Sequence, residues 1–370
     1  MDFALDDEQA LIVQTVRRFA ERELRAAAGD ADRAGAAPAA LAGKAGELGL
    51  FLDAVPAASD GLLDGSYSHL TRALRGYELG RGCAALAARL EANVEPALAA
   101  GRWASAETRA ALFADLAGGA LATTARDSRG VLAVDDLGAA GVRVHGRLGP
   151  VVLAAEATTV LLLAEHAATP IVALVPAAAL GRTAITPSGW RAAGWASVEF
   201  DQVTLAPAQL LARGEGARAV AAEILAWARV SLAARAAGVA AAAIEAARAY
   251  AETRVQFGQP IGRFESLIRL GDDGETLART ARLVALHAAW MLDRLGRAGG
   301  GDPAEVFDAA SRARVVASDA VTRASIDAVQ IFGGYGFVND YPVEKAMRDA
   351  RAFEAILGDE RLDRVLAGRR

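Results

Sequence analysis

The hydrophobic pattern at the start of the chain is helical. Apolar residues of the segment DDEQALIVQTVRRFAEREL recur at three- to four-residue spacing: Leu11, Ile12, Val16, Phe19 and Leu24. Such spacing puts the apolar side chains on one face of a helix, and the acidic residues near its start suit the helix dipole. Alanine-rich amphipathic segments continue further along the chain, so residues 1–118 are predicted to form a helical domain.

The pattern changes after residue 118. Short β-branched segments bounded by glycine or proline follow one another, among them GVRVHGRLGPVVL, ATTVLLLAE and IVALVPA. In WASVEFDQVTLAP, apolar positions alternate through Val198 and Phe200 toward Val203, which is typical of a strand with one buried face. Residues 119–212 are therefore predicted to form a β-domain of modest size.

From residue 213 onward the pattern is helical again. The segment 215–258 is long enough for one very long helix or a helix pair, and Pro260 ends it. Three further amphipathic segments follow, and their many small residues would let helices approach closely. Residues 213–370 are therefore predicted to form a four-helix bundle, and the whole chain an α+β fold.

Composition and charge exclude several classes of protein. The chain is 53% hydrophobic and 23% charged with a net charge of −5, and its arginines are dispersed among acids, so we expect no nucleic-acid partner. Charges interrupt the apolar runs before 18 residues, so no membrane partner is expected. The acidic start and the single cysteine, Cys83, favour a cytoplasmic protein. The histidines are too far apart for metal-ligand spacing: His69, His145, His166 and His287.

The segment RVQFGQPIGRFES carries groups suited to a nucleotide. The guanidinium of Arg254 can fork onto a diphosphate, Gln256 offers an amide, and Phe257 offers a flat apolar face. Gly258 and Pro260 turn the chain so that these side chains project together. The segment is therefore a candidate cofactor contact.

A second candidate is QIFGGYGFVNDYPVEKAMRDAR. Gly333 and Gly334 would let the backbone approach a nucleotide, and Gln330 can hydrogen-bond an adenosine. Taken alone, the glycines are equally well explained as the C-terminal cap of a helix.

Together, the order of domains and these two motifs resemble the acyl-CoA dehydrogenase family across essentially the whole chain. The resemblance implies FAD as cofactor and α,β-dehydrogenation of an acyl-CoA thioester. In this family the two motifs reach the FAD of a neighbouring subunit, so the resemblance assigns that role to the following residues: Arg254, Gln256, Phe257, Gln330, Gly333 and Gly334.

Where the family covers its own flavin and substrate, this sequence departs from the pattern. The flavin-covering loop aligns with residues 121–130, which lack the usual acid, proline and glycines and carry Arg126 and Arg129 instead. Pro150 replaces the tryptophan that stacks on the flavin, and Val152 stands where a threonine or serine would bond to the ring. The chain's own flavin site is therefore predicted to be degraded.

The catalytic carboxylate is also missing, so no catalytic residue is assigned. Its two usual positions in the family are occupied by Leu357 and Ala228. Glu354 would lie one helical turn from Leu357 and is the nearest substitute, with Asp359 and Glu360 just beyond. Arg229 is the one candidate for substrate binding, at a position where the family often has an arginine near the adenine of acyl-CoA, although the accompanying aspartate is replaced by alanine.

These losses and retentions favour one hypothesis. The chain would be the base-lacking subunit of a heteromeric, α2β2 acyl-CoA dehydrogenase that completes the FAD site of a partner subunit carrying the carboxylate, acting on an acyl-CoA that is steroid-derived by family analogy. Two alternatives stay open. One is a flavoenzyme of the same fold with altered chemistry, such as an oxygenase or tailoring dehydrogenase, and the other is a flavin-free oligomeric scaffold.

Overall fold

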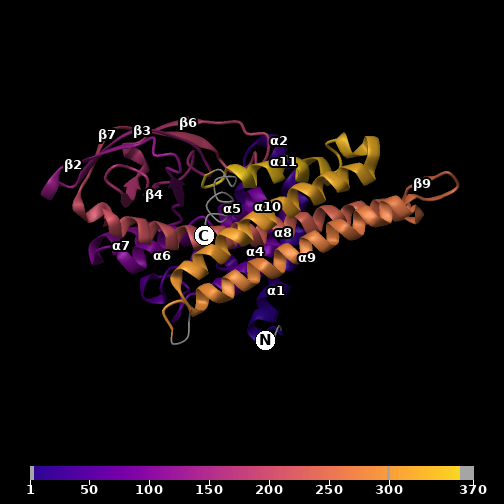
Figure 1. The fold of residues 1–370 in the computed structure, drawn as a ribbon, viewed down its shortest axis with the longest axis horizontal. Helices are drawn as coiled ribbons and strands as arrows, with labels where there is room; N and C mark the ends of the chain where they lie inside the picture. The colour runs from indigo at the N-terminus through magenta and orange to yellow at the C-terminus, as the bar shows by residue number, and fades with distance from the viewer. Residues whose placement is uncertain (1–3, 298–300, 359–370) are drawn as a thin grey trace.

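The first part of the chain is helical, as predicted. The computed structural model describes residues 4–297 and 301–358 (Figure 1). Asp6 caps the first helix, because its carboxylate accepts from the backbone N–H of Gln9. In return, Oε1 of Gln9 accepts from the backbone N–H of Asp6. A π-helical turn, Ala20–Leu24, joins this helix to the next. The helices are α1 (Asp7–Phe19), α2 (Arg25–Ala34), α3 (Ala39–Glu47), α4 (His69–Gly82), α5 (Ala84–Leu90), α6 (Val94–Trp103) and α7 (Ala106–Ala117).

Two four-stranded sheets follow. One has the order β1-β4-β5-β8 and the other β2-β3-β7-β6, and all neighbouring strands are antiparallel except β1 and β4. The alternation predicted in β7 is confirmed, because Val198, Phe200 and Val203 are all buried between the sheets. The strands are β1 (Ala122–Arg126), β2 (Ala133–Asp136), β3 (Val142–Val151), β4 (Thr159–Ala164), β5 (Ile171–Pro176), β6 (Gly181–Ala184), β7 (Ala196–Leu205) and β8 (Leu210–Arg213).

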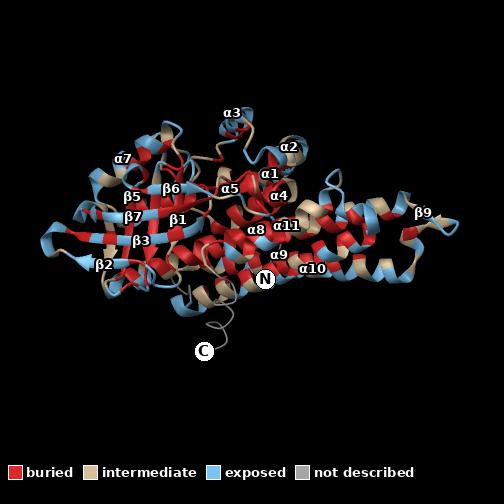
Figure 2. Cartoon of the chain, turned by 90° about the horizontal axis from the view of Figure 1, so that it is seen from above, coloured by how far each residue is buried: buried red, intermediate tan, exposed pale blue. Residues whose placement is uncertain are grey.

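The bundle is built around one long helix. Segment 215–258 forms a single helix, α8 (Glu215–Thr253), rather than a helix pair, and ends in a hairpin of β9 (Val255–Gln256) and β10 (Gln259–Pro260). An 18-residue window of α8 is apolar enough to cross a membrane, with a mean hydropathy of 1.4, but 83% of that window is buried inside the protein, as in a core helix (Figure 2). The other bundle helices are α9 (Glu265–Arg294), α10 (Pro303–Phe332) and α11 (Pro342–Ala355).

The N-terminal helices and the bundle share one hydrophobic core, whereas the two sheets enclose their own. Close approach of α4 to α8 depends on two glycines. A Cβ on Gly80 would lie 2.4 Å from the carbonyl oxygen of Arg235, and a Cβ on Gly238 would lie 2.1 Å from that of Tyr77. The small residues of this region therefore allow the close helix packing that the sequence predicts.

A buried ionic cluster joins α4, α8, the loop after α3, and the α5–α6 connection with the start of α6. Arg72 pairs with Glu95 at 2.8 Å, and Arg75 pairs with Glu91 at 3.1 Å. Charges in this cluster balance, since each cation has a carboxylate partner. Its ionic members are Asp53, Arg72, Arg75, Glu91, Glu95 and Arg235.

Candidate functional site

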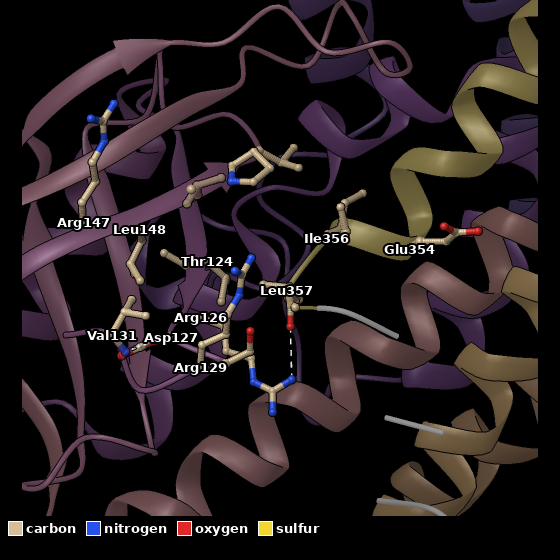
Figure 3. A pocket seen from close by; sticks show the side chains of 18 of the residues that line it. Thr124, Arg126, Asp127, Arg129, Val131, Arg147, Leu148, Glu354, Ile356 and Leu357 are labelled. Atoms are coloured by element: carbon tan, nitrogen blue, oxygen red, sulfur yellow. Dashed lines mark hydrogen bonds between the residues drawn. The ribbon is translucent and has the colours of Figure 1, made fainter. Parts of the chain in front are cut away.

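A cavity of about 390 Å³ lies between the β-domain and the end of α11. Its walls come from β1 and the loop after it, from the end of β3, and from residues 354–358 (Figure 3). The four residues that depart from the family's flavin cover all line this cavity: Arg126, Arg129, Pro150 and Val152. The position of the missing base, Leu357, lines it too. This cavity is therefore the place where the chain's own active site would be.

The backbone on either side of Leu357 is held in place by hydrogen bonds. Helix α11 ends at Ala355, Ile356 is extended, and Leu357 is left-handed with φ 58°. From α10, Arg314 donates to the carbonyls of Ile356 at 2.7 Å and Gly358 at 3.0 Å. The backbone at the base position is thus ordered, and what is missing there is the carboxylate itself.

Arg126 spans the cavity from the opposite wall. Its Nε donates to Glu165 Oε1 at 2.6 Å, and its Nη1 donates to the carbonyl of Leu357 at 3.1 Å (Figure 3). The side chains of Arg126 and Glu165 are only 4% and 8% exposed, so the ion pair is almost fully desolvated. A buried, fixed guanidinium therefore stands where the family has small residues.

The strand end that would face a flavin in this family has no ring-binding side chain. Pro150 is exposed at the end of β3, and the carbonyl of Val152 accepts from Thr123 Oγ1 at 2.7 Å. Valine offers no hydrogen-bond donor and proline no aromatic plane. Together with Arg126, these residues do not fit a flavin ring, and we derive no chemical step in this cavity.

The expectation that Glu354 shares a helical face with Leu357 is wrong. The helix stops at Ala355, so the one-turn spacing does not apply, and Glu354 instead pairs with Arg351. Figure 3 shows its carboxylate pointing away from Leu357. Asp359 and Glu360 lie outside the described residues. Glu354 is therefore not placed to act as the base.

Ala228 and Arg229 lie in the middle of α8. Both are buried, at 4% and 8% exposure. No carboxylate can therefore come from Ala228, and the expected contact of Arg229 with acyl-CoA stays a prediction.

The first cofactor motif lies at the far end of the molecule. The β9–β10 hairpin is at one end of the long bundle, and the two sheets are at the other (Figures 1 and 2). Phe257 is 93% exposed in a left-handed conformation, φ 52°, and Gln256 Nε2 donates to the carbonyl of Val255 at 2.8 Å. The guanidinium of Arg254 lies 5.2 Å from the ring centre of Tyr335. Arg254 is therefore ordered by a cation–π contact.

The second motif joins the first at this end. Tyr250 of α8 stacks on Phe332 of α10 with ring centres 4.2 Å apart, which holds the ends of the two helices together. Gln330 is exposed, and a Cβ on Gly333 or Gly334 would have no heavy atom within 4 Å. We call this end, with its hairpin and glycine turn, the tip. All six predicted cofactor residues lie there, and Tyr335 was missed because a ring beside a glycine turn carries no signal of its own.

The tip fits a nucleotide diphosphate that approaches from outside. It combines an ordered cation, an amide, an exposed ring and a backbone open at two glycines. Metal chemistry has no comparable support. No group of three or more histidine, cysteine, aspartate or glutamate residues with ligand geometry occurs among residues 4–297 and 301–358.

The chain consists of a helical domain, a β-domain and a helical bundle, and the tip of that bundle suits a nucleotide. This three-part architecture is typical of a class of FAD-dependent dehydrogenases. Family models for the N-terminal and C-terminal domains of acyl-CoA dehydrogenase match residues 6–120 and 214–370. A probable acyl-CoA dehydrogenase of Bacillus subtilis, YngJ, is 30% identical over 395 residues, covering 100% of this chain and 99% of the relative. The chain belongs to the acyl-CoA dehydrogenase family, and FAD is the cofactor of this family.

Solved structures have the same fold. Butyryl-CoA dehydrogenase from Megasphaera elsdenii superposes with a TM-score of 0.85 at 23% identity, over 100% of this chain and 99% of that one. A chain of the ChsE4–ChsE5 complex from Mycobacterium tuberculosis gives 0.83 at 23% identity, over 100% and 98%. The predicted α+β architecture is confirmed.

Proposed function

We propose that this chain is the base-lacking subunit of a heteromeric acyl-CoA dehydrogenase. Its tip would complete the FAD site of a second acyl-CoA dehydrogenase-like subunit that carries the catalytic carboxylate. The proposed assembly is an α2β2 heterotetramer in the cytoplasm. It would oxidise the α,β-bond of an acyl-CoA thioester.

One observation carries this proposal. The six residues suited to FAD lie on the tip, at the opposite end of the chain from its own cavity (Figure 1), and all of them except the half-buried Arg254 are exposed. A side chain at the tip cannot serve a flavin in the same chain's cleft, so its natural target is a cofactor in another chain. Phe257 supports this reading, because a 93% exposed aromatic side chain is costly unless something covers it.

The polar and glycine residues of the tip would have different tasks. Arg254 would neutralise the diphosphate, Gln256 and Gln330 would hydrogen-bond polar groups of the nucleotide, and the two glycines would let the backbone approach it. When bound, FAD supplies the hydride acceptor of the reaction. The role of this chain would be to bind and orient that cofactor.

The cavity argues against catalysis within this chain. Leu357 and Ala228 provide no base, and Arg126 occupies the gap between the β-domain and the end of α11. A homomer would repeat these defects at every site. A partner that carries the carboxylate removes the difficulty, and the ChsE4–ChsE5 complex is an example of two differently named proteins associating within this fold.

The proposal extends to the class of acyl-CoA substrate. If only half the sites are active, the unused halves leave room for a bulky acyl group, and a polycyclic, steroid-derived CoA thioester is the proposed substrate. This step rests on analogy with the family.

Co-expression tests the proposal. The chain is produced alone and together with the dehydrogenase-like product of the neighbouring gene, and flavin absorbance and mass are measured for both samples. We expect a colourless chain alone and a yellow heterotetramer with about one FAD per αβ pair. A yellow and active chain alone would favour the flavoenzyme with altered chemistry. Absence of flavin from both samples would favour the scaffold.

A matched pair of variants tests the tip. Arg254→Ala should lower FAD occupancy of the complex, because the diphosphate loses its cation. Arg22→Ala removes the same charge from an exposed position on the N-terminal helices and should leave occupancy unchanged. Equal FAD occupancy in the two variants would contradict a role of the tip in FAD binding.

A further inference from the structure

Four aromatic rings pack together at the tip, and none of them is among the six residues assigned to FAD. Tyr250 comes from α8, Phe332 from the end of α10, Tyr335 from the glycine turn, and Tyr341 from the residue before α11. The centres of neighbouring rings lie 4.2–6.4 Å apart. We call these four residues the aromatic cluster.

Tyr341 holds a central place in the aromatic cluster. Its ring centre lies 5.3 Å from that of Phe332, 5.7 Å from that of Tyr335 and 6.1 Å from that of Tyr250. In all three pairs the ring planes are inclined to each other by 59–73°. Tilted and edge-to-face pairs of this kind are favourable for aromatic side chains, so Tyr341 connects the other three rings.

The contact between Tyr341 and Phe332 closes the glycine turn. Phe332 directly precedes the turn, Gly333–Phe337, and Tyr341 follows it by four residues. Within the described part of the chain, a Cβ on Gly333 or Gly334 would meet no heavy atom within 4 Å, so packing does not support the turn at these glycines. The path of the exposed backbone therefore depends on how its two ends are held.

The aromatic cluster also reaches Arg254. Tyr335 lies between Tyr341 and this cation, because its ring centre is 5.7 Å from that of Tyr341 and 5.2 Å from the guanidinium. Tyr250 is linked to Arg254 through the backbone, since its carbonyl accepts from the Arg254 N–H at 2.9 Å. The cation and the glycine turn are therefore joined through one set of rings.

We propose that Tyr341 is a positioning residue for the FAD site that the tip completes. This inference rests on the proposed function, because it concerns the same site. The ring of Tyr341 holds Tyr335 beside Arg254 and fixes the glycine turn, so the guanidinium and the open backbone are set together for the diphosphate and adenosine of FAD. Groups that are ordered before binding lose less conformational entropy when the ligand arrives.

Flavin titration of the flavin-depleted, co-expressed complex tests this role. Tyr341→Leu should weaken FAD binding about three- to tenfold, because the ring contacts are lost. Tyr341→Phe keeps the ring and should bind FAD as the wild type does. Phe113→Leu, at a 2% exposed ring on α7, is the matched control, since it removes a buried ring far from the tip motifs in sequence and should leave FAD binding unchanged.

FMN separates positioning from general loosening of the fold. This flavin lacks the AMP half of FAD, which is the half that the tip would contact, so Tyr341→Leu should bind FMN as the wild type does. Equal losses of FAD and FMN affinity would overturn the positioning role, as would unchanged FAD affinity. If Tyr341→Leu does not assemble with the partner, Tyr341→Met fills the space with a flexible side chain and should show the same selective loss.

A double-mutant cycle tests whether Tyr341 acts through Arg254. In the Arg254→Ala background, Tyr341→Leu should cost less FAD affinity than it does in the wild type, because the cation that the ring positions is already gone. Equal losses in the two backgrounds would overturn this coupling. An Arg254→Ala complex with wild-type FAD affinity would instead contradict the proposed function, so failure of one proposal can be told from failure of the other.

Discussion

Arg126 Nη1 donates a hydrogen bond to the carbonyl of Leu357 at 3.1 Å, across 231 positions of the chain. This contact joins β1 to the segment that follows α11, on opposite walls of the cavity. The same guanidinium pairs with Glu165. The backbone of Leu357, the position that lacks the catalytic carboxylate, is thus hydrogen-bonded to a guanidinium. Arg126 therefore connects the two walls of the cavity.

Arg126→Met should be strongly destabilising. It would remove the arginine partner of the buried Glu165, leaving only His166 Nε2 at 3.5 Å, and would remove the bond to Leu357. Loss of one member of a buried pair costs about 3–5 kcal/mol. The free energy of unfolding from urea denaturation measures this cost. The double variant Arg126→Met/Glu165→Gln should recover part of it, because no uncompensated charge remains. Equal stabilities for the single and double variants would contradict a buried ion pair at this position.

Leu357→Glu should not create a second active site. The new carboxylate would face a cavity with a fixed guanidinium and no ring-binding side chains. In the co-expressed complex we expect kcat to change less than about twofold, whereas removal of the partner's base should lower it by about two orders of magnitude or more. Doubled activity, together with a second FAD per αβ pair, would show that the cavity accepts flavin after all.

Tyr335 should contribute to FAD binding by ordering Arg254. A cation–π contact at an exposed site is worth about 0.5–1 kcal/mol, so Tyr335→Leu should weaken FAD binding by the complex about two- to fivefold. Tyr335→Phe keeps the ring and should bind FAD as the wild type does. Fluorescence titration of the apo complex measures both. A similar loss in the Phe variant would assign the effect to the hydroxyl group instead of the ring face.

The architecture was predictable because it depends on local signals. Helical spacing and the alternation at Val198 and Phe200 are short-range features, and each produced the expected element. The expected end of the long helix at Pro260 is wrong, because α8 stops at Thr253 and Pro260 lies in the hairpin that follows. The sequence of segment 215–258 is compatible with one helix or with two. The structure resolves it as one helix, because no proline or turn signal interrupts the segment before Thr253.

The cavity could not be predicted because it depends on long-range contacts. Helical spacing placed Glu354 one turn from Leu357, yet the helix stops at Ala355 and Arg314 of α10 binds the carbonyls beyond it. Nothing in the sequence near Leu357 signals that interaction. The same holds for Arg126: the sequence indicates only a side chain too bulky for a flavin cover, whereas its partners Glu165 and Leu357 are distant in the chain.

Stability should decrease in acid because of His69. Burial, together with the smaller effect of the nearby cation Arg72, lowers the pKa of this imidazole to about 3. The unfolded chain would bind a proton at His69 near its ordinary pKa of about 6.5, whereas the folded chain stays neutral down to about 3. The unfolded state therefore holds more protons between these values, and the free energy of unfolding falls as pH decreases through this window, by at most about 1.4 kcal/mol per pH unit. His69→Phe keeps a ring that can stack on Trp227 but cannot titrate, so its stability should depend less on pH. Urea denaturation at several pH values between about 3 and 7 measures the difference, and parallel curves for the two proteins would refute a buried neutral His69.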